Sequence, residues 1–201
     1  LRVDEVGERI PLTIFDYDRK SGTVSIIFQI VGATTRKLSL LKKGDYLFDF
    51  VGPLGNPTNT NDINKVLVIG GGVGTAIAFP ICKELYESKK EVDAIVGFRN
   101  KELVILEDDF RDVTKQFFIM TDDGSYGEKG LVTEKLEKLI LSGSNYERVY
   151  AIGPLPMMKF VSKVCEKYNI PVIVSMNSIM IDGTGMCGCC RLLVDGKVRF
   201  A

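Results

Sequence analysis

The sequence of 201 residues contains no histidine. This absence excludes imidazole general bases, serine–histidine and cysteine–histidine nucleophile pairs, histidine-ligated zinc and histidine-ligated iron–sulfur centres. Any chemistry of this chain must therefore use cysteine thiols, carboxylates, backbone groups or a bound cofactor.

The sequence also lacks an excess of charge of either sign, because 26 Lys and Arg residues balance 26 Asp and Glu residues. A nucleic-acid partner requires a basic surface, so we expect none. The longest nearly apolar run, residues 66–79, is too short and too rich in glycine to span a membrane, and no secretory signal opens the chain. Because the first residue is Leu1 rather than Met, and the chain opens within a pattern, we expect a piece of a longer protein or a partly ordered protein.

Cysteine is scarce and unevenly placed, since three of the five cysteines lie within residues 187–190. An odd number with such crowding is not a disulfide framework; it indicates metal ligation and a reducing compartment, so we expect a cytoplasmic protein. Cys82 and Cys165 fall in helical patterns and are expected in the core.

Two patterns divide the chain. The first part is rich in β-branched and aromatic runs, such as residues 23–31 and 46–51, with glycines between them and no helical periodicity. A polar linker over residues 56–64 separates it from an alternation of apolar strands and helices. We therefore expect an all-β domain, an α/β domain and a cysteine-bearing segment, over residues 1–58, 59–175 and 176–201.

The alternation in the second part predicts an open parallel sheet covered by helices on both faces, because its strands are continuously apolar. The expected strands are residues 65–69, 92–98, 116–120, 149–152 and 171–175. The expected helices are residues 73–88, 101–111 and 130–141, and one that starts at Pro154.

A glycine turn follows the first of these strands and opens a helix. Glycines let the backbone approach a pyrophosphate, and the helix offers unpaired N–H groups, so the pattern indicates a dinucleotide site; a tight turn without a ligand is the alternative. Ligands of parallel sheets lie at the carboxyl ends of the strands, so further candidates come from the other strand ends. The candidates for NAD(H) are Gly70, Gly71, Gly72, Gly74, Thr75, Arg99, Asp122, Asp123, Gly153 and Pro154.

Arg99 occupies the strand end where an NAD site usually has an acid. A cation there could meet a 2′-phosphate, which leaves NADP possible; Arg99 could instead hold the pyrophosphate or be solvated. In the β region, a cation, hydroxyls and a glycine turn could hold another anionic group, and an ordinary barrel surface is equally compatible. These candidates are Arg9, Pro11, Leu12, Thr13, Gly32, Thr34 and Thr35.

The stretch from Asp182 to Cys190 has the spacing D-x4-C-x2-C, which is that of a plant-type [2Fe–2S] loop with Asp in place of the first Cys. The candidate metal ligands are Asp182, Cys187 and Cys190, with Cys189 between them as a spare thiol that points away. Reduced cysteines in a glycine turn and a zinc site are the alternatives.

Together these motifs resemble the ferredoxin–NADP reductase superfamily, and specifically its bacterial iron–sulfur flavoprotein electron-transfer subunits. Residues 9–13 and 32–35 are similar to that family's flavin elements, residues 52–55 to its G-P-L-G, and residues 153–157 to its G-P-x-P-M. The resemblance implies a partial flavin-binding β-barrel whose first strands are absent, then an NAD(P)-binding α/β domain, then a cluster segment whose fourth ligand would follow residue 201.

Two related families fit these motifs. One is the electron-transfer subunit of dihydroorotate dehydrogenase, whose pattern has cysteines where this chain has Ile152 and Asp182. The other is the small subunit of the bifurcating NADH-dependent ferredoxin–NADP oxidoreductase, also known as sulfide dehydrogenase, whose pattern is nearly reproduced. We favour the second.

The resemblance implies an enzyme subunit that moves electrons between NAD(H), FAD and a [2Fe–2S] cluster. It also implies a larger partner subunit that carries flavin and [4Fe–4S] clusters. Arg9 and Thr13 are expected near the flavin. A cofactor-free assembly or binding module is the alternative of another class.

Overall fold

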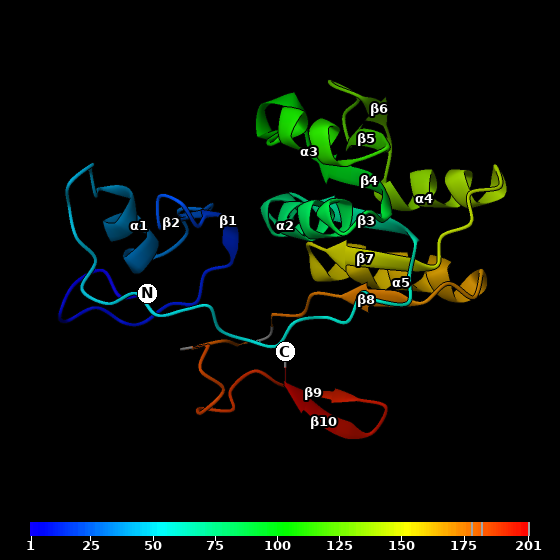
Figure 1. Cartoon of the computed structure of the whole chain (residues 1–201). Coiled ribbons are helices and arrows are strands. Elements are labelled where there is room, and N and C mark those ends of the chain that lie inside the picture. The colour runs from blue at the N-terminus through cyan, green and yellow to red at the C-terminus, as the bar shows by residue number, and fades with distance from the viewer. Residues whose placement is uncertain (178, 182, 201) are drawn as a thin grey trace. The chain divides into compact units, whose positions relative to one another are not determined.

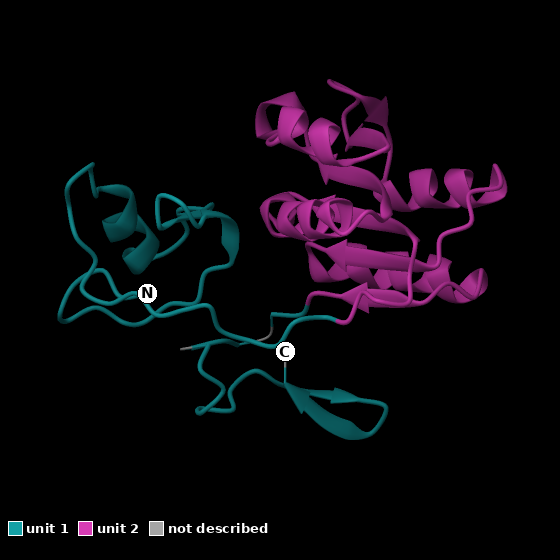
Figure 2. Ribbon diagram, in the orientation of Figure 1, with its two compact units in different colours: residues 1–58, 176–201 teal, residues 59–175 magenta. Residues whose placement is uncertain are grey.

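The computed structural model describes residues 1–177, 179–181 and 183–200. The chain divides into two compact units, which are coloured separately in Figure 2: residues 1–58 with 176–201, called unit 1, and residues 59–175, called unit 2. Each is described by itself.

Unit 2 is built on a six-stranded parallel sheet with the order β6-β5-β4-β3-β7-β8 (Figure 1). Its central strands are mostly apolar, and residues 66–69 are completely buried, because helices cover both faces. The parallel sheet expected from the sequence is therefore confirmed. The strands are β3 (Lys65–Gly71), β4 (Glu91–Phe98), β5 (Gln116–Thr121), β6 (Glu128–Lys129), β7 (Arg148–Ile152) and β8 (Val172–Val174).

Helices α2 (Gly74–Glu87) and α3 (Glu107–Val113) pack together, as do α4 (Val132–Leu141) and α5 (Leu155–Lys167) (Figure 1). Close contacts of successive β3 glycines place α2 on one face of the sheet and α5 on the other, since neighbouring residues of a strand point to opposite faces. Cys82 and Cys165 are fully buried, which confirms their expected place in the core. Within the described residues, every helix falls short of the length and apolarity that a membrane crossing needs.

The prediction of one continuous helix over residues 101–111 is wrong. The structure has a short 3-10 turn, η1 (Lys101–Leu103), and then α3, separated by Leu106 with φ +62°. A left-handed residue cannot continue a right-handed helix, so the chain restarts at Glu107. The restart lets Phe110 reach the core, where it stacks on Phe117 at 5.3 Å between ring centroids.

Unit 1 contains two antiparallel ribbons, β1 (Ile14–Asp18) with β2 (Thr23–Ile26) and β9 (Arg191–Val194) with β10 (Lys197–Phe200). It also contains a helix, α1 (Ala33–Ser39), so the expectation that residues 1–58 hold no helix is wrong.

Helix α1 forms because Thr35 closes its first turn and Leu38 is buried beneath it. A seven-residue helix is too short to show periodicity in the sequence, and β-branched threonines at its start favour a strand on composition alone.

The strand expected over residues 46–51 is also absent from the structure. In the described residues this stretch forms an isolated bridge between Arg2 and Asp49, whose backbone groups exchange hydrogen bonds of 2.8 and 3.1 Å, and the Phe48 N–H donates to the Val3 carbonyl at 3.3 Å. Tyr46 is 89% exposed. Aromatic composition favours a strand only where neighbouring strands are in place to pair with its backbone.

A buried polar pair stabilises the amino-terminal half of the sheet in unit 2. The Asp93 carboxylate is fully buried in β4 and accepts hydrogen bonds from the Tyr146 hydroxyl at 2.8 Å and from the Gln116 N–H at 3.1 Å. Burial and the neighbouring carboxylate raise the pKa of Tyr146, so its hydroxyl remains a donor. The pair joins the loop before β7 to the centre of the sheet.

We predict that Tyr146→Phe lowers the free energy of unfolding of this protein by about 1–3 kcal/mol, because one oxygen of a buried carboxylate loses its partner. Urea unfolding followed by circular dichroism measures the change. Tyr168→Phe is the matched control, since that hydroxyl donates to the partly exposed Glu137 carboxylate. Equal effects of the two substitutions would contradict the prediction.

Candidate functional site

The predicted nucleotide residues of unit 2 come together at the carboxyl edge of its parallel sheet. The turn after β3 donates from the Gly72 N–H to the Gly97 carbonyl at 2.9 Å. The turn after β5 donates from the N–H groups of Asp122 and Asp123 to the carbonyls of Phe98 and Arg99, at 3.1 and 3.3 Å. Backbone bonds therefore hold three strand ends side by side.

Two glycines of the turn after β3 are required for different reasons. Gly72 has φ +54°, a conformation that other residues adopt at a cost. At Gly74, a Cβ would lie 2.7 Å from the Ile152 carbonyl oxygen, so glycine allows α2 to start directly against the end of β7. The helix N-terminus thereby lies at the strand ends, where its N–H groups favour an anion.

Thr75 does not present its hydroxyl at this edge. The residue is fully buried, its N–H donates to the Gly72 carbonyl at 3.1 Å, and a Cβ on Gly70 would lie 3.0 Å from Thr75 Oγ1. Thr75 therefore shapes the turn, and contact with a ligand would come from the backbone of the half-buried Gly72 and the exposed Val73.

The polar side chains of the edge are Arg99, Asp122 and Asp123, and all three are exposed. The Ser125 hydroxyl and N–H donate to the Asp123 carboxylate at 2.6 and 2.9 Å, and these bonds lower the pKa of Asp123. An ionised acid and a cation on adjacent strand ends suit the hydroxyls and phosphates of a dinucleotide.

Met157 was not among the predicted site residues, although the G-P-x-P-M pattern contains it. A Cβ on Gly71 would lie 2.5 Å from Met157 Sδ, and one on Gly153 would lie 2.8 Å from Met157 Cε. Met157 therefore packs over the junction of the turns after β3 and β7. Pro154 is exposed at the start of α5.

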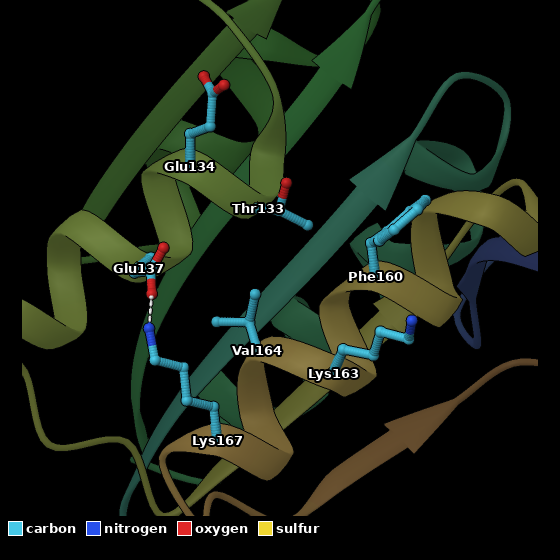
Figure 3. A pocket seen from close by; sticks show the side chains of 7 residues that line it. All are labelled: Thr133, Glu134, Glu137, Phe160, Lys163, Val164 and Lys167. Atoms are coloured by element: carbon cyan, nitrogen blue, oxygen red, sulfur yellow. Dashed lines mark hydrogen bonds and ion pairs between the residues drawn. The ribbon is translucent and has the colours of Figure 1, made fainter.

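Two shallow grooves of about 300 Å³ lie elsewhere on unit 2. Figure 3 shows the one between α4 and α5, where an ion pair of 2.7 Å between Lys167 and Glu137 joins its walls. The predicted nucleotide residues line neither groove. Neither groove therefore forms part of the candidate nucleotide site.

In unit 1, the candidate flavin residues lie in the segment before β1 and at the start of α1. Thr34 is buried and donates to Glu8 at 2.8 Å, while Thr35 Oγ1 accepts from the Gly32 N–H at 2.9 Å. Both hydroxyls are thus used by the fold. Arg9 forms an ion pair with Asp49 through Nη2, and its buried Nε has no hydrogen-bond partner within the described residues.

The cysteine segment also belongs to unit 1, where it approaches the candidate flavin residues. A Cβ on Gly183 would lie 3.6 Å from side-chain atoms of both Pro11 and Leu54. Thr13, which follows Pro11 and Leu12, is exposed directly before β1. Three motifs far apart in the sequence therefore meet in one place.

The structure describes two of the three candidate metal ligands, Cys187 and Cys190. Asp182 lies outside the described residues, and the described part of the chain contains no group of three or more cysteine or carboxylate side chains placed around a metal position. The five cysteines, all of them described, form no disulfide. The donor chemistry of Cys187 and Cys190 suits iron, but the described geometry does not assemble a ligand set, so no chemical step is derived through a cluster.

Cys189 does not point away from its neighbours as expected. Its thiol donates to the Cys187 carbonyl at 3.9 Å. A hydrogen bond with the Cys187 side chain is the main factor that raises the pKa of Cys189. Gly188 between them has φ +63°, which bends the chain at this point.

Unit 2 resembles a known family of oxidoreductase domains. Residues 68–163 match the oxidoreductase NAD-binding domain, which spans the candidate edge of unit 2. Unit 2 is thus the nucleotide-binding domain type of an oxidoreductase.

Curated relatives then give the particular family. The chain is 43% identical over 201 residues to a dihydroorotate dehydrogenase B (NAD(+)) electron transfer subunit homolog of Thermotoga maritima, covering all of this chain and 71% of the relative. It is 36% identical over 189 residues to the electron transfer subunit of dihydroorotate dehydrogenase B of Streptococcus pneumoniae R6, covering 92% and 72%.

A solved structure of an NADH-dependent reduced ferredoxin-NADP oxidoreductase is 42% identical, with a TM-score of 0.91, and covers all of this chain and 72% of that chain. The chain belongs to the family of dihydroorotate dehydrogenase B electron transfer subunits and their homologues, which have the ferredoxin–NADP reductase-like fold.

We predict that Gly74→Ala lowers the free energy of unfolding by about 1–3 kcal/mol, because the added methyl group meets the backbone at the end of β7, which cannot rotate away. Thermal unfolding measures the change, and quenching of NADH fluorescence should show weaker binding. Gly32→Ala is the control, since a Cβ there meets nothing within 4 Å and φ is −139°. A Gly74→Ala variant as stable as the control would refute the prediction.

Proposed function

We propose that this chain is an electron-transfer subunit that would bind NAD(H), FAD and a [2Fe–2S] cluster and move electrons between them toward a partner subunit. The observation that carries the proposal is the assembled carboxyl edge of unit 2 in a chain of the electron transfer subunit family. The proposed division assigns residues 1–58 to FAD, 59–175 to the nicotinamide nucleotide and 176–201 to the cluster.

The nucleotide is proposed to lie with its pyrophosphate against the glycine turn, at the start of the 14-residue helix α2. The first turn of α2 carries no acidic residue that would repel it. Arg99 is proposed to contact phosphate, and the ionised Asp123 a ribose hydroxyl. The pairing of an acid with a cation supports NAD(H). The Arg99 side chain could also meet the 2′-phosphate of NADP, so NADP is compatible with the site.

The flavin is proposed to bind to unit 1 through Arg9, Pro11, Leu12, Thr13 and the Gly32–Thr35 turn. The buried Arg9 Nε without a partner in the described residues is a donor that fits a phosphate or a flavin oxygen. Asp49 holds the guanidinium in position, while Thr34 and Thr35 fix the turn rather than contact the ligand. The bound cofactors supply the hydride transfer between nicotinamide and flavin.

The cluster is proposed to be held by Asp182, Cys187 and Cys190. Carboxylate is a harder ligand than thiolate, so an Asp ligand should shift the reduction potential and weaken the site. The proximity of Gly183 to Pro11 and Leu54 supports placing the cluster segment beside the proposed flavin residues of unit 1.

The partner is proposed to be a larger subunit with flavin and [4Fe–4S] clusters, as in bifurcating ferredoxin–NADP oxidoreductase. The Asp182 position and the TM-score of 0.91 to the NADH-dependent oxidoreductase structure support this choice. The names of the curated relatives support the alternative, a dihydroorotate dehydrogenase partner. Co-purification from the native source distinguishes the two partners.

We predict that NADH bleaches the visible absorbance of the FAD-reconstituted protein under anaerobic conditions. Arg99→Ala should raise the NADH concentration for half-reduction by about tenfold, the effect of one lost charge-assisted hydrogen bond. Arg148→Ala is the matched control, because it removes the same charge at the start of β7, at the other end of the sheet. A protein that binds no flavin, or whose flavin NADH leaves oxidised, would support the cofactor-free binding module instead.

We predict that anaerobic reconstitution loads iron and sulfide into the protein, and that Cys187→Ser and Cys190→Ser each reduce the iron content severalfold, because a cluster rarely survives the loss of a thiolate. Iron analysis and electron paramagnetic resonance of the reduced protein measure the result. Cys82→Ala, in the core of unit 2, is the control. Stoichiometric zinc without iron would show that the cluster assignment is wrong.

A further inference from the structure

The Ser125 hydroxyl joins the two loops that carry Arg99 and Asp123 at the carboxyl edge of unit 2. Its oxygen accepts a hydrogen bond of 2.8 Å from the Lys101 N–H at the start of η1, and the hydroxyl donates one of 2.6 Å to Asp123 Oδ1. A serine hydroxyl has a single hydrogen to donate. Its donor is therefore used on Asp123, while its oxygen binds the loop that follows β4.

Asp123 is held through its backbone as well as through its side chain. Its N–H donates to the Arg99 carbonyl at 3.3 Å, and its Oδ1 also accepts from the Ser125 N–H at 2.9 Å. The Lys101 side chain lies over the Tyr126 ring, with 5.3 Å between Nζ and the ring centroid. The loop after β4 and the loop after β5 therefore contact each other at several points around Asp123.

The bonds from Ser125 leave one oxygen of the Asp123 carboxylate available. Both bonds are made to Oδ1, so neither uses Oδ2, and the residue is exposed. Oδ2 can therefore accept a hydrogen bond from a ligand while Oδ1 keeps the carboxylate in one orientation.

We propose that Ser125 is a positioning residue that fixes the Asp123 carboxylate for a ribose 2′-hydroxyl, and thereby makes the site prefer NAD(H) to NADP(H). This role rests on the proposed function, because it requires the nucleotide to bind at the carboxyl edge of unit 2. It assigns the choice between the two nucleotides to a residue that acts through Asp123 and touches neither of them.

The preference follows from what a fixed carboxylate does to each nucleotide. It accepts a hydrogen bond from the 2′-hydroxyl of NAD(H), whereas the 2′-phosphate of NADP(H) brings negative charge toward it. A carboxylate that has lost the Ser125 hydroxyl can rotate about its side-chain bonds. It then binds the hydroxyl less well and repels the phosphate less.

The same hydrogen bonds keep the carboxylate ionised. The bond from the Ser125 hydroxyl is the largest cause that lowers the pKa of Asp123, the bond from the Ser125 N–H is the next, and the positive charge of Lys129 in β6 acts in the same direction. The other charged side chains of residues 99–101 and 122–125 are Arg99, Lys101 and Asp122. Loss of the hydroxyl should therefore raise the pKa of Asp123 toward its ordinary value.

The test measures the binding of ADP-ribose and of 2′-phospho-ADP-ribose to the full chain by isothermal titration calorimetry at neutral pH. Both probes contain the pyrophosphate and both riboses but no nicotinamide, so neither flavin nor electron transfer is needed. We expect Ser125→Ala to weaken ADP-ribose binding about fivefold, the effect of one lost hydrogen bond, and to change 2′-phospho-ADP-ribose binding by less than about twofold. Equal weakening of both probes would show that Ser125 only maintains the loop, and would overturn the positioning role.

Three further variants separate positioning from folding. Ser125→Thr keeps the hydroxyl and should retain the preference for ADP-ribose. Ser21→Ala is the matched control, because that hydroxyl donates to the exposed Asp18 carboxylate at 2.8 Å in unit 1, and it should leave both affinities unchanged. In an Asp123→Ala background, Ser125→Ala should no longer affect ADP-ribose binding; an undiminished effect would contradict action through Asp123.

The pH dependence of ADP-ribose binding gives an independent readout. The pyrophosphate stays ionised in weakly acidic buffers, so a loss of affinity that Asp123→Ala abolishes reports protonation of Asp123. Because the hydroxyl lowers the pKa of that carboxyl, Ser125→Ala should lose affinity at a higher pH than the unsubstituted protein does. Coincident pH profiles would overturn the positioning role.

The two levels of inference fail in different ways. Unsubstituted protein that binds neither probe would contradict the proposed nucleotide site, and the positioning role with it. Unsubstituted protein that prefers ADP-ribose, with the same preference in Ser125→Ala, would uphold the nucleotide site and overturn the role of Ser125 alone.

Discussion

Burial of the parallel sheet on both faces is the constraint on which the rest of unit 2 depends. The strands β3, β4 and β7 lie at its centre, where residues 66–69 have no exposed surface, and each must satisfy its backbone groups through neighbouring strands. Helical crossovers join the central parallel strands, and parallel pairing brings all strand ends of one polarity to one edge. The candidate nucleotide site is a consequence of that edge.

Close packing at the edge leaves little freedom in its sequence. The starts of α2 and α5 meet the ends of β3 and β7 so closely that a methyl group at Gly74 would meet the backbone. Met157 fills the space between two of the turns. Glycine therefore serves helix–strand packing here, and the close-packed turn that results is rigid.

Unit 1 differs, because its described strands form only two-stranded ribbons rather than a sheet covered by helices. Hydrogen bonds and ion pairs stabilise more of its structure. Examples are the hydrogen bond that the Thr35 hydroxyl accepts at the start of α1 and the ion pair between Arg9 and Asp49. The cysteine turn lies in this unit, where Cys187 and Cys189 are exposed. That exposure distinguishes these thiols from the buried thiols of Cys82 and Cys165 in the core of unit 2.

The sequence by itself determined the alternation of unit 2, the glycine turn after β3 and the burial of Cys82 and Cys165, because apolar runs and glycine placement are local properties. It also carried the family's motifs in order, and the comparisons bear out that membership.

Only the tertiary structure decided the features that depend on partners distant in the chain. Leu106, with its left-handed backbone, divides the helix expected over residues 101–111. The hydroxyls of Thr34 and Thr35 form hydrogen bonds within the protein. The Cys189 thiol points toward Cys187, and residues 46–51 form a single bridge instead of a strand. Composition records what a residue favours on average, whereas the contacts of the folded chain select which preference is met.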